Sequence, residues 1–266
     1  MIRIPKLLIG LAVILVTAGA GAQSAPSDLD REIQNPLSRL YLLPLQYNGY
    51  QNVGPYNRTQ SAFNIQPVVP VVGEKWFVVN RFVVPVVSQP DVAENKSIFG
   101  LGDILYQGYF APSPRVGENL WGVGPAFQFP SGTDDALSTK KWSIGPTFAW
   151  VSQPGNWTFG GLFTQLWSFA GQEERDDVNQ LQILPLIYYR LSGGTSLSFL
   201  HTITANWNES SGNQWTVPVG MSVNQIVQHP WFYPFEIQLG AYGNVIRPDN
   251  SSDWLLKLQL NFVLPR

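Results

Sequence analysis

The sequence predicts an all-β protein, a transmembrane antiparallel up-and-down β-barrel of about 12 strands. Short segments with alternating apolar and polar residues recur from about residue 40 to the end of the chain. Longer and shorter connections alternate between these segments, and all ten tryptophans lie near segment ends. Indole rings prefer the interface between lipid and water, so tryptophan at the ends of so many strands favours a barrel in a membrane.

The first 22 residues have the features of a secretory signal peptide. Arg3 and Lys6 precede an apolar run over residues 7–16, and small residues follow as far as Ala22. A basic start, a short apolar core and small residues before the cleavage site are typical of such a peptide. The run is too short to cross a bilayer as a helix. We therefore expect residues 1–22 to be removed, with cleavage at or shortly after Ala22.

The composition narrows the possible functions. Cleavage removes two of the 16 Lys and Arg and none of the 18 Asp and Glu, so the mature chain has a net charge of −4 and no sign of a nucleic-acid-binding surface. There is no cysteine, which excludes disulfides, cysteine zinc sites and thiol catalysis. The mean hydropathy of −0.03 suits a barrel, because only every second strand residue faces lipid. We expect neither a metal nor a cofactor.

Residues 23–39 form a separate N-terminal segment, expected either to lie in the periplasm or to enter the barrel as a plug. They do not alternate, and Leu29, Ile33 and Leu37 recur at about helical spacing. A short helix is therefore expected, with Asn35 as a candidate cap and Pro36 at its first position.

The barrel domain, residues 40–266, shows its strand pattern most clearly at the end. The even positions from Trp254 to Leu264 are apolar, whereas the odd positions include Lys257 and Gln259. Successive strand side chains point to opposite faces, so one face meets lipid and the other faces the lumen. The expected strands cover residues 40–51, 60–72, 75–87, 98–110, 119–130, 141–152, 156–169, 178–191, 195–207, 214–227, 231–246 and 254–264.

The tryptophans fall into two groups of five, as expected for two aromatic girdles. Barrels of this kind have short periplasmic turns and longer external loops, so the first strand is expected to run outward. Beside the predicted short turns lie Trp76, Trp121, Trp150, Trp157 and Trp231. Beside the predicted long loops lie Trp142, Trp167, Trp207, Trp215 and Trp254.

Proline is the main conflict with a closed barrel, because proline cannot donate to the hydrogen-bond ladder. We therefore expect bulges or irregular strands near the prolines within predicted strands, which are Pro67, Pro70, Pro85, Pro125, Pro146, Pro185 and Pro218. His201 is a second conflict, since it shares strand parity with Phe199 and Ile203 and would face lipid. A bulge that shifts the register there would remove this cost.

The charged residues expected to line the lumen are Arg81, Asp103, Arg190, Glu236 and Lys257. In each of their strands the opposite face is more apolar. Folding the hairpin about residue 93 places Asp103 opposite Val83, diagonal to Arg81, which predicts an ion pair between Arg81 and Asp103. Such a pair would either tune selectivity at a constriction or bridge a nearly filled barrel interior.

Several stretches of the chain resemble the MetA-pathway of phenol degradation family of bacterial outer-membrane proteins. Members of this family are described as transporters and are sometimes labelled neuromedin U. The resemblance covers most of the mature chain and implies an outer-membrane barrel for uptake of small, apolar or aromatic molecules, without a defined substrate. The matching stretches are residues 34–36, 64–70, 99–103, 121–125, 130–137, 203–207 and 215–218.

The predicted function is a porin-like channel or transporter for passive uptake of small molecules in the outer membrane of a Gram-negative bacterium, and not an enzyme. The expected partners are outer-membrane lipid, the barrel assembly machinery and an unidentified small-molecule substrate, with no nucleic acid. One alternative is a structural, non-conducting barrel. A less favoured one is a phospholipase-like enzyme, whose chemistry needs a histidine beside a nucleophilic serine. Neither His201 nor His229 has a serine at the expected position.

Overall fold

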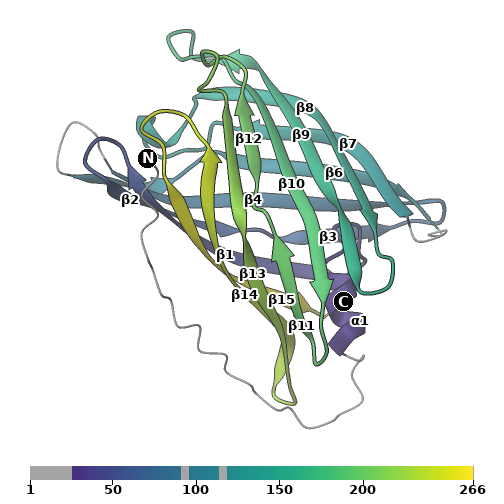
Figure 1. Ribbon diagram of the computed structural model, residues 1–266. Coiled ribbons are helices and arrows are strands. Elements are labelled where there is room, and N and C mark those ends of the chain that lie inside the picture. Colours follow the sequence, from purple (N-terminus) through teal and green to yellow (C-terminus); the bar gives the residue numbers. More distant parts are fainter. Residues whose placement is uncertain (1–25, 91–95, 114–118, 266) are drawn as a thin grey trace.

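The computed structural model describes residues 26–90, 96–113 and 119–265, which form a closed antiparallel barrel of twelve strands (Figure 1). This confirms the predicted fold class. The predicted signal peptide and its cleavage site lie outside the described residues. A short helix, α1 (Pro26–Ile33), precedes the barrel. Within the described ranges, no helix is long and apolar enough to cross a membrane.

The wall is an up-and-down barrel, in which strands pair with their neighbours in chain order and β15 returns to pair with β1. Fifteen segments make the twelve strands, because three strands are each split in two: β2 with β3, β5 with β6, and β11 with β12. The segments are β1 (Tyr41–Val53), β2 (Arg58–Ile65), β3 (Val68–Val72), β4 (Trp76–Pro90), β5 (Ser97–Leu101), β6 (Ile104–Pro112), β7 (Asn119–Phe129), β8 (Lys141–Ser152), β9 (Trp157–Gly171), β10 (Asn179–Arg190), β11 (Thr195–Phe199), β12 (Ile203–Asn206), β13 (Trp215–His229), β14 (Phe232–Ile246) and β15 (Trp254–Leu264).

Side-chain alternation gives the wall an apolar outside and a mixed inside. In β8 the aromatic residues Trp142, Phe148 and Trp150 are exposed, whereas Ser143 and Thr147 between them are buried. β15 behaves in the same way, with its even-numbered leucines outward and its odd-numbered polar residues inward. A period of two residues in the sequence therefore becomes two chemically different surfaces.

The two ends of the barrel differ. At the turn end, defined by the short turns and by the closing pair of Tyr41 with Leu264, the chain reverses within a few residues. At the loop end lie longer connections, among them residues 130–140, 172–178 and 207–214. A 3-10 turn, η1 (Asp135–Leu137), lies within the first of these loops.

The irregularity expected from proline occurs, and it is concentrated at the three strand breaks. Gln66 and Pro67 separate β2 from β3, and the Gln66 amide donates to the carbonyl of Pro44 in β1. The break between β5 and β6 faces Pro85, whose carbonyl accepts from the amide of Gly102. Because a proline lacks the N–H that a ladder partner would need, each break lies where the regular pattern could not continue.

His201 turns inward at the third break without any change of register. Ile187 pairs with Phe199 on one side of the break, and Ile183 pairs with Ile203 on the other, so the spacing is the same. Leu200 has a φ of 67°, which lies in the left-handed region rather than in the strand region. The expected register shift is therefore wrong. His201 is buried beside this non-strand residue, opposite Pro185 in β10.

Two Gly-Pro steps interrupt the ladder in a second way. Pro125 of β7 stands opposite Pro146 of β8, and the ladder is missing on the far side of each proline. Gly124 and Gly145, the residues before them, approach neighbouring backbone so closely that a Cβ at either position would collide with a carbonyl oxygen. The repeated Gly-Pro motif thus allows two strands to bend together.

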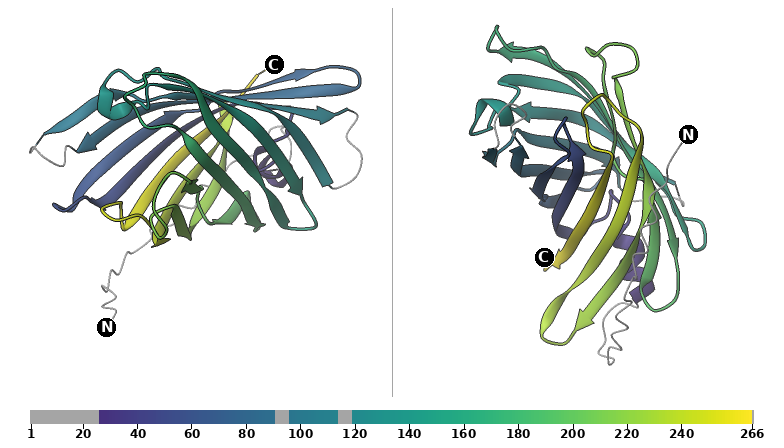
Figure 2. Two further views of the ribbon diagram at one scale, coloured as in Figure 1. Left: turned by 90° about the horizontal axis from the view of Figure 1, so that it is seen from above. Right: turned by 60° about the vertical axis from the view of Figure 1, so that its left-hand side comes forward.

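The N-terminal segment packs at the turn end of the barrel. Leu29 of α1 belongs to one apolar cluster with Leu42, Ile226 and Val263, which come from three different strands. Figures 1 and 2 show α1 near the same end as the C-terminus. A short helix is present in this segment, as expected, but it covers Pro26–Ile33; the expected helix start, with Asn35 as the cap and Pro36 at the first position, is wrong, because the chain forms a turn there.

The tryptophans lie at or near strand ends, and eight of the ten are exposed. Trp121 and Trp150 pair directly across β7 and β8, and Trp207 meets Trp215 edge-on with their ring centroids 5.3 Å apart. Their division between two membrane interfaces stays a prediction.

We expect Gly145→Ala to destabilise the barrel by about 1–3 kcal/mol, because its methyl group would overlap the carbonyl oxygen of Gln165. Gly243→Ala is the matched control, since a Cβ there would meet no atom within 4 Å. The free energy of unfolding of both variants can be measured by refolding in a series of urea concentrations, with the folded fraction read from the heat-dependent shift in gel mobility. Equal stability of the two would contradict the close approach of β8 and β9.

Candidate functional site: the lumen and its two ends

Two adjoining cavities lie in the barrel interior. A lumenal cavity of about 490 Å³ lies in the middle of the barrel, and a vestibule of about 800 Å³ lies at the loop end. Asp103 and Gln128 line both cavities and therefore mark the neck between them. The opposite limit of the lumenal cavity is formed by residues 33–38 of the N-terminal segment, which we call the floor.

The lumenal cavity has two faces of different chemistry. The amide face comes from β1, β2, β14 and β15 and from the break after β2, and consists of Gln46, Asn48, Asn64, Gln66, Gln238, Gln259 and Asn261. The apolar face comes from β4, β6, β9 and β10 and consists of Val79, Val83, Leu105, Leu162, Leu184 and Leu186. The lumen is therefore amphipathic across its width.

Arg81 lies at the seam between these two faces. Its Nη2 donates to Oε1 of Gln66 at 2.6 Å, and its Nη1 donates to Oε1 of Gln107. Val79 and Val83, its same-face neighbours along β4, belong to the apolar face. Both partners of the guanidinium are neutral amides, and no carboxylate in the described part of the chain forms an ion pair with it. Arg81 is thus a lumenal cation without a protein counter-ion.

Lys257 and Glu236 share a hydrogen-bonded chain on the amide side. The Lys257 ammonium donates to Oε1 of Gln238 at 2.9 Å, and the Gln238 amide donates to Oε2 of Glu236 at 2.5 Å. Asn261 donates to the same Glu236 oxygen at 2.6 Å. Glu236 is fully buried behind the cavity lining, whereas Lys257 lines the cavity. The charge of Lys257 is therefore partly balanced through Gln238.

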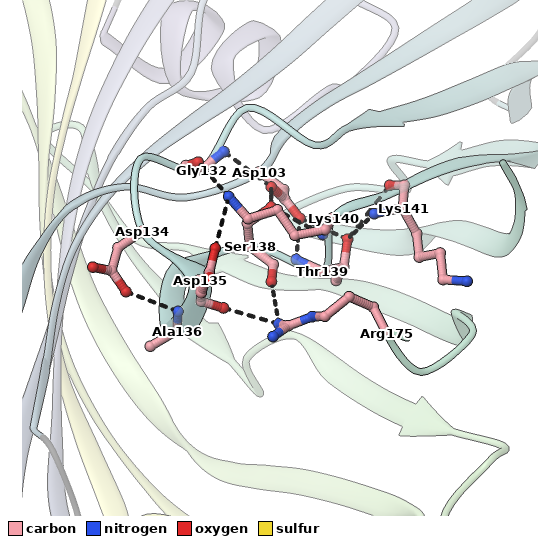
Figure 3. Close-up of polar contacts among 10 residues, drawn as sticks. All are labelled: Asp103, Gly132, Asp134, Asp135, Ala136, Ser138, Thr139, Lys140, Lys141 and Arg175. Carbon is pink, nitrogen blue, oxygen red and sulfur yellow. Dashed lines mark hydrogen bonds and ion pairs between the residues drawn. The ribbon is translucent and has the colours of Figure 1, made fainter. Parts of the chain in front are cut away.

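The Asp103 carboxylate is used as an acceptor for the loop between β7 and β8. It accepts hydrogen bonds from the backbone amides of Gly132 and Thr139, at 3.1 and 2.7 Å, and from the hydroxyls of Ser138 and Thr139, both at 2.7 Å. Gln128 adds a longer bond at 3.5 Å. Figure 3 shows Gly132, Ser138 and Thr139 around the carboxylate. The predicted ion pair with Arg81 is therefore wrong.

The reason is a register difference in the hairpin that carries both residues. Val83 pairs with Leu105, and Val86 pairs with Leu101, so Asp103 lies nearest Pro85 and further from Arg81 than expected. The break beside Asp103 also admits the incoming loop. Thr133 exchanges two hydrogen bonds with the backbone of Leu101, in place of a ladder partner.

A second loop is tied to the first at the loop end. Arg175 donates to the backbone carbonyls of Asp135 and Ser138, at 2.9 and 2.7 Å (Figure 3). Lys141 and Asp177 form an ion pair of 3.2 Å, and this contact holds the pKa of Asp177 below its usual value. Together the two loops narrow the vestibule.

The floor is held by a buried polar cluster at the turn end. Gln34 donates to Asp30 at 2.5 Å and to Ser196 at 3.2 Å, and it accepts from Thr158 at 2.8 Å. Arg190 donates to Thr158 at 2.9 Å and also reaches Gln34. Burial raises the pKa of Asp30 to about 6. Gln34 and Asp30 therefore join the N-terminal segment to β9, β10 and β11.

The five charged residues predicted for the lumen have different positions. Arg81, Asp103 and Lys257 line the cavity, Glu236 lies behind its lining, and Arg190 is buried at the turn end against the floor.

Three residues that line the lumenal cavity were not predicted from the sequence, and only one of them is marked by a sequence feature. Gln66 and His201 enter the lumen through strand breaks, and His201 lies 3.4 Å from the Gln46 amide. Gln34 belongs to a segment whose position the sequence left open. The signal for Gln66 was the following Pro67, which marks a break in a strand.

The two histidines have other partners than the serine that a phospholipase-like enzyme would need. His201 contacts Gln46 and packs edge-on against Tyr242, and His229 accepts from the amide of Trp231. Within the described ranges, neither imidazole is hydrogen-bonded to a serine hydroxyl. The same residues contain no group of three or more His, Cys, Asp or Glu able to hold a metal ion.

Comparison with known proteins places the chain by fold. No family model and no curated protein matches it. An outer membrane channel from Pseudomonas putida F1 is similar in structure, with a TM-score of 0.57 and 15% identity over 86% of this chain and 97% of that chain. The calcium-bound outer membrane phospholipase dimer from Salmonella typhi gives a TM-score of 0.44 and 12% identity over 91% and 99%. Outer membrane phospholipase A from Escherichia coli gives 0.46 and 11% over the same shares.

The likeness to the Pseudomonas putida channel is a likeness of fold, and it agrees with the predicted β-barrel architecture.

We expect Asp103→Ala to release the loop between β7 and β8, because four donors of that loop lose their acceptor. Hydrogen bonds to a charged group contribute about 1.5–3 kcal/mol each, so amide exchange at Gly132 and Thr139 should rise about tenfold or more. Asp134→Ala is the control, since this exposed carboxylate accepts only from the amide of Ala136. Unchanged exchange in Asp103→Ala would contradict the proposed anchoring.

Docking of the floor should weaken as the pH rises from about 4 to about 6. The pKa of Asp30 is raised from 3.8 to about 6 by burial, so the docked state binds its proton more tightly than the released state. The stabilising contribution is therefore complete below pH 3.8 and is lost as the pH passes 6. Exchange of the α1 amides, corrected for intrinsic rates, measures this. Asp30→Asn should abolish the pH dependence, and its persistence there would assign the effect to another group.

Proposed function

We propose that this protein is an outer-membrane channel for passive uptake of small molecules. The observation that carries the proposal is that a vestibule and a lumenal cavity adjoin inside the barrel at Asp103 and Gln128, which line both. A wall that is apolar outside and partly polar inside suits an aqueous path through lipid. The fold shared with the Pseudomonas putida channel adds support.

The lining favours solutes that are partly apolar. Six aliphatic side chains form one face of the lumenal cavity, and a purely hydrophilic pore would have no use for them. The volume of about 490 Å³ is within the range of sites that enclose small ligands. The proposed solutes are therefore small molecules with an apolar or aromatic body, as the family resemblance also implies.

The competing function is a structural barrel that does not conduct. The floor is the observation in its favour, because buried contacts hold residues 33–38 across the end of the cavity. In the proposed channel the floor is a plug that must shift for solutes to leave the cavity at the turn end. The two functions therefore differ in what release of the floor does.

Single-channel recording of the refolded mature protein in a planar bilayer tests the proposal. We expect discrete conductance steps, because the vestibule and the lumenal cavity adjoin at Asp103 and Gln128 and would together form one path from the loop end. A correctly folded barrel that stays silent under all conditions, including after release of the floor, would favour the structural alternative.

Release of the floor is best tested with Arg190→Met. This change removes the hydrogen bonds from the guanidinium to Gln34, Thr158 and the carbonyl of Gly155. We expect a several-fold increase in open probability. Arg247→Met, which loses an exposed ion pair with Asp253 at the loop end, is the matched control and should leave conductance unchanged. If Arg190→Met conducts like the wild type, the floor does not obstruct the path.

A further inference from the structure

Arg81 is a charged group in a position that requires explanation. Its guanidinium lines a cavity enclosed by the barrel wall, and burying a charge without a partner of opposite charge is costly. Its two hydrogen-bond acceptors, Gln66 and Gln107, are neutral. Two of its five N–H donors are used in this way, so others are available to a further acceptor.

No carboxylate of the cavity serves as its counter-ion. Asp103 faces the same cavity, but its oxygens accept five hydrogen bonds, four of them from the loop between β7 and β8. Glu236 lies behind the lining and accepts from Gln238 and Asn261. The other cation that lines the cavity, Lys257, is connected to Glu236 through Gln238. The uncompensated charge in the lumen is therefore that of Arg81.

From this arrangement we propose that the lumenal cavity binds small organic acids, whose carboxylate is held by Arg81 and whose apolar body lies against the apolar face. The planar guanidinium matches a carboxylate with two parallel hydrogen bonds. Val79 and Val83 flank Arg81 along β4, and Leu105 of the neighbouring strand β6 lines the same cavity. A ligand with one charged end and one aliphatic or aromatic end satisfies both at once.

The amide face contributes a fixed geometry to this site. Gln66 holds Arg81 from one side and donates to Gln46 at 2.8 Å, while Gln107 holds it from the other and donates to Thr164 at 2.7 Å. This belt of hydrogen bonds runs from β1 to β9 and restricts the guanidinium to the seam. Because the guanidinium is already held in place, little conformational entropy is lost when a carboxylate binds, which favours binding.

The inference deepens the proposed channel function, because it names the class of solute that the same cavity would take. Binding of an acid and conduction through the barrel are nevertheless separate properties. They can be measured on the same protein by separate experiments, calorimetry in lipid nanodiscs and recording in planar bilayers.

The test uses three probes with the mature protein in nanodiscs: cyclohexanecarboxylate, its neutral amide cyclohexanecarboxamide, and acetate. We expect the carboxylate to bind at least about tenfold more tightly than either of the others, because only it has both the charge and the apolar body. Equal binding of the acid and the amide by the wild type would overturn the proposal.

Substitutions of Arg81 and Lys257 test which of the two cations binds the carboxylate. Arg81→Gln should reduce binding of cyclohexanecarboxylate to the level of its amide, whereas Lys257→Gln should preserve the preference for the acid. If Arg81→Gln does not fold, Arg81→Lys is the substitute. It keeps the positive charge but cannot form two parallel hydrogen bonds with a carboxylate, so a partial loss of the preference for the acid is expected. A preference for the acid that survives in Arg81→Gln, or that disappears only in Lys257→Gln, would refute the assignment.

Recording from the same preparations separates the two proposals. A wild-type barrel that conducts without preferring the acid leaves the channel function intact and refutes the acid site. A silent barrel that binds the acid through Arg81 supports the site and contradicts conduction.

Discussion

Every backbone N–H and C=O in the wall must find its partner within the protein, because the hydrocarbon of a membrane offers none. Closure of the ladder from β15 to β1, with Tyr41 opposite Leu264 and Gln51 opposite Trp254, meets this requirement around the whole ring. The many strand prolines work against it, since each removes one donor. The rest of the structure depends on how the wall accommodates them.

The wall does so by breaking three strands, and each break delivers a polar side chain to the lumen. Gln66, Asp103 and His201 all lie at such breaks and all line the lumenal cavity. At the second break, the orphaned backbone of Leu101 is satisfied by Thr133 from the loop between β7 and β8. The breaks therefore add polar groups to the lumen, whereas most of the amide face, such as Gln46 and Gln259, comes from regular strands.

The two ends of the barrel are closed by similar chemistry. At the loop end the Asp103 carboxylate gathers the donors of one loop, and at the turn end Asp30, Gln34 and Arg190 join the N-terminal segment to the wall. At each end a carboxylate accepts hydrogen bonds from the segment or the wall that it joins. At the turn end, Leu29 and Leu37 add apolar packing between the N-terminal segment and the wall, so this closure is held by both kinds of contact.

Local periodicity in the sequence determined the number of strands, their order and which residues face outward, because a β-strand alternates with a period of two and neighbouring strands in a meander pair in chain order. The predicted limits of β8 and β15 agree with the structure to the residue. The expected ion pair of Asp103 with Arg81 and the expected register shift at His201 were wrong, since a register difference of two residues and one residue with positive φ have no clear local signature. The partners of Arg81, the anchoring of the loop by Asp103 and the position of the floor all join residues far apart in sequence. Only the closed barrel brings these residues together, and so only the tertiary structure decided them.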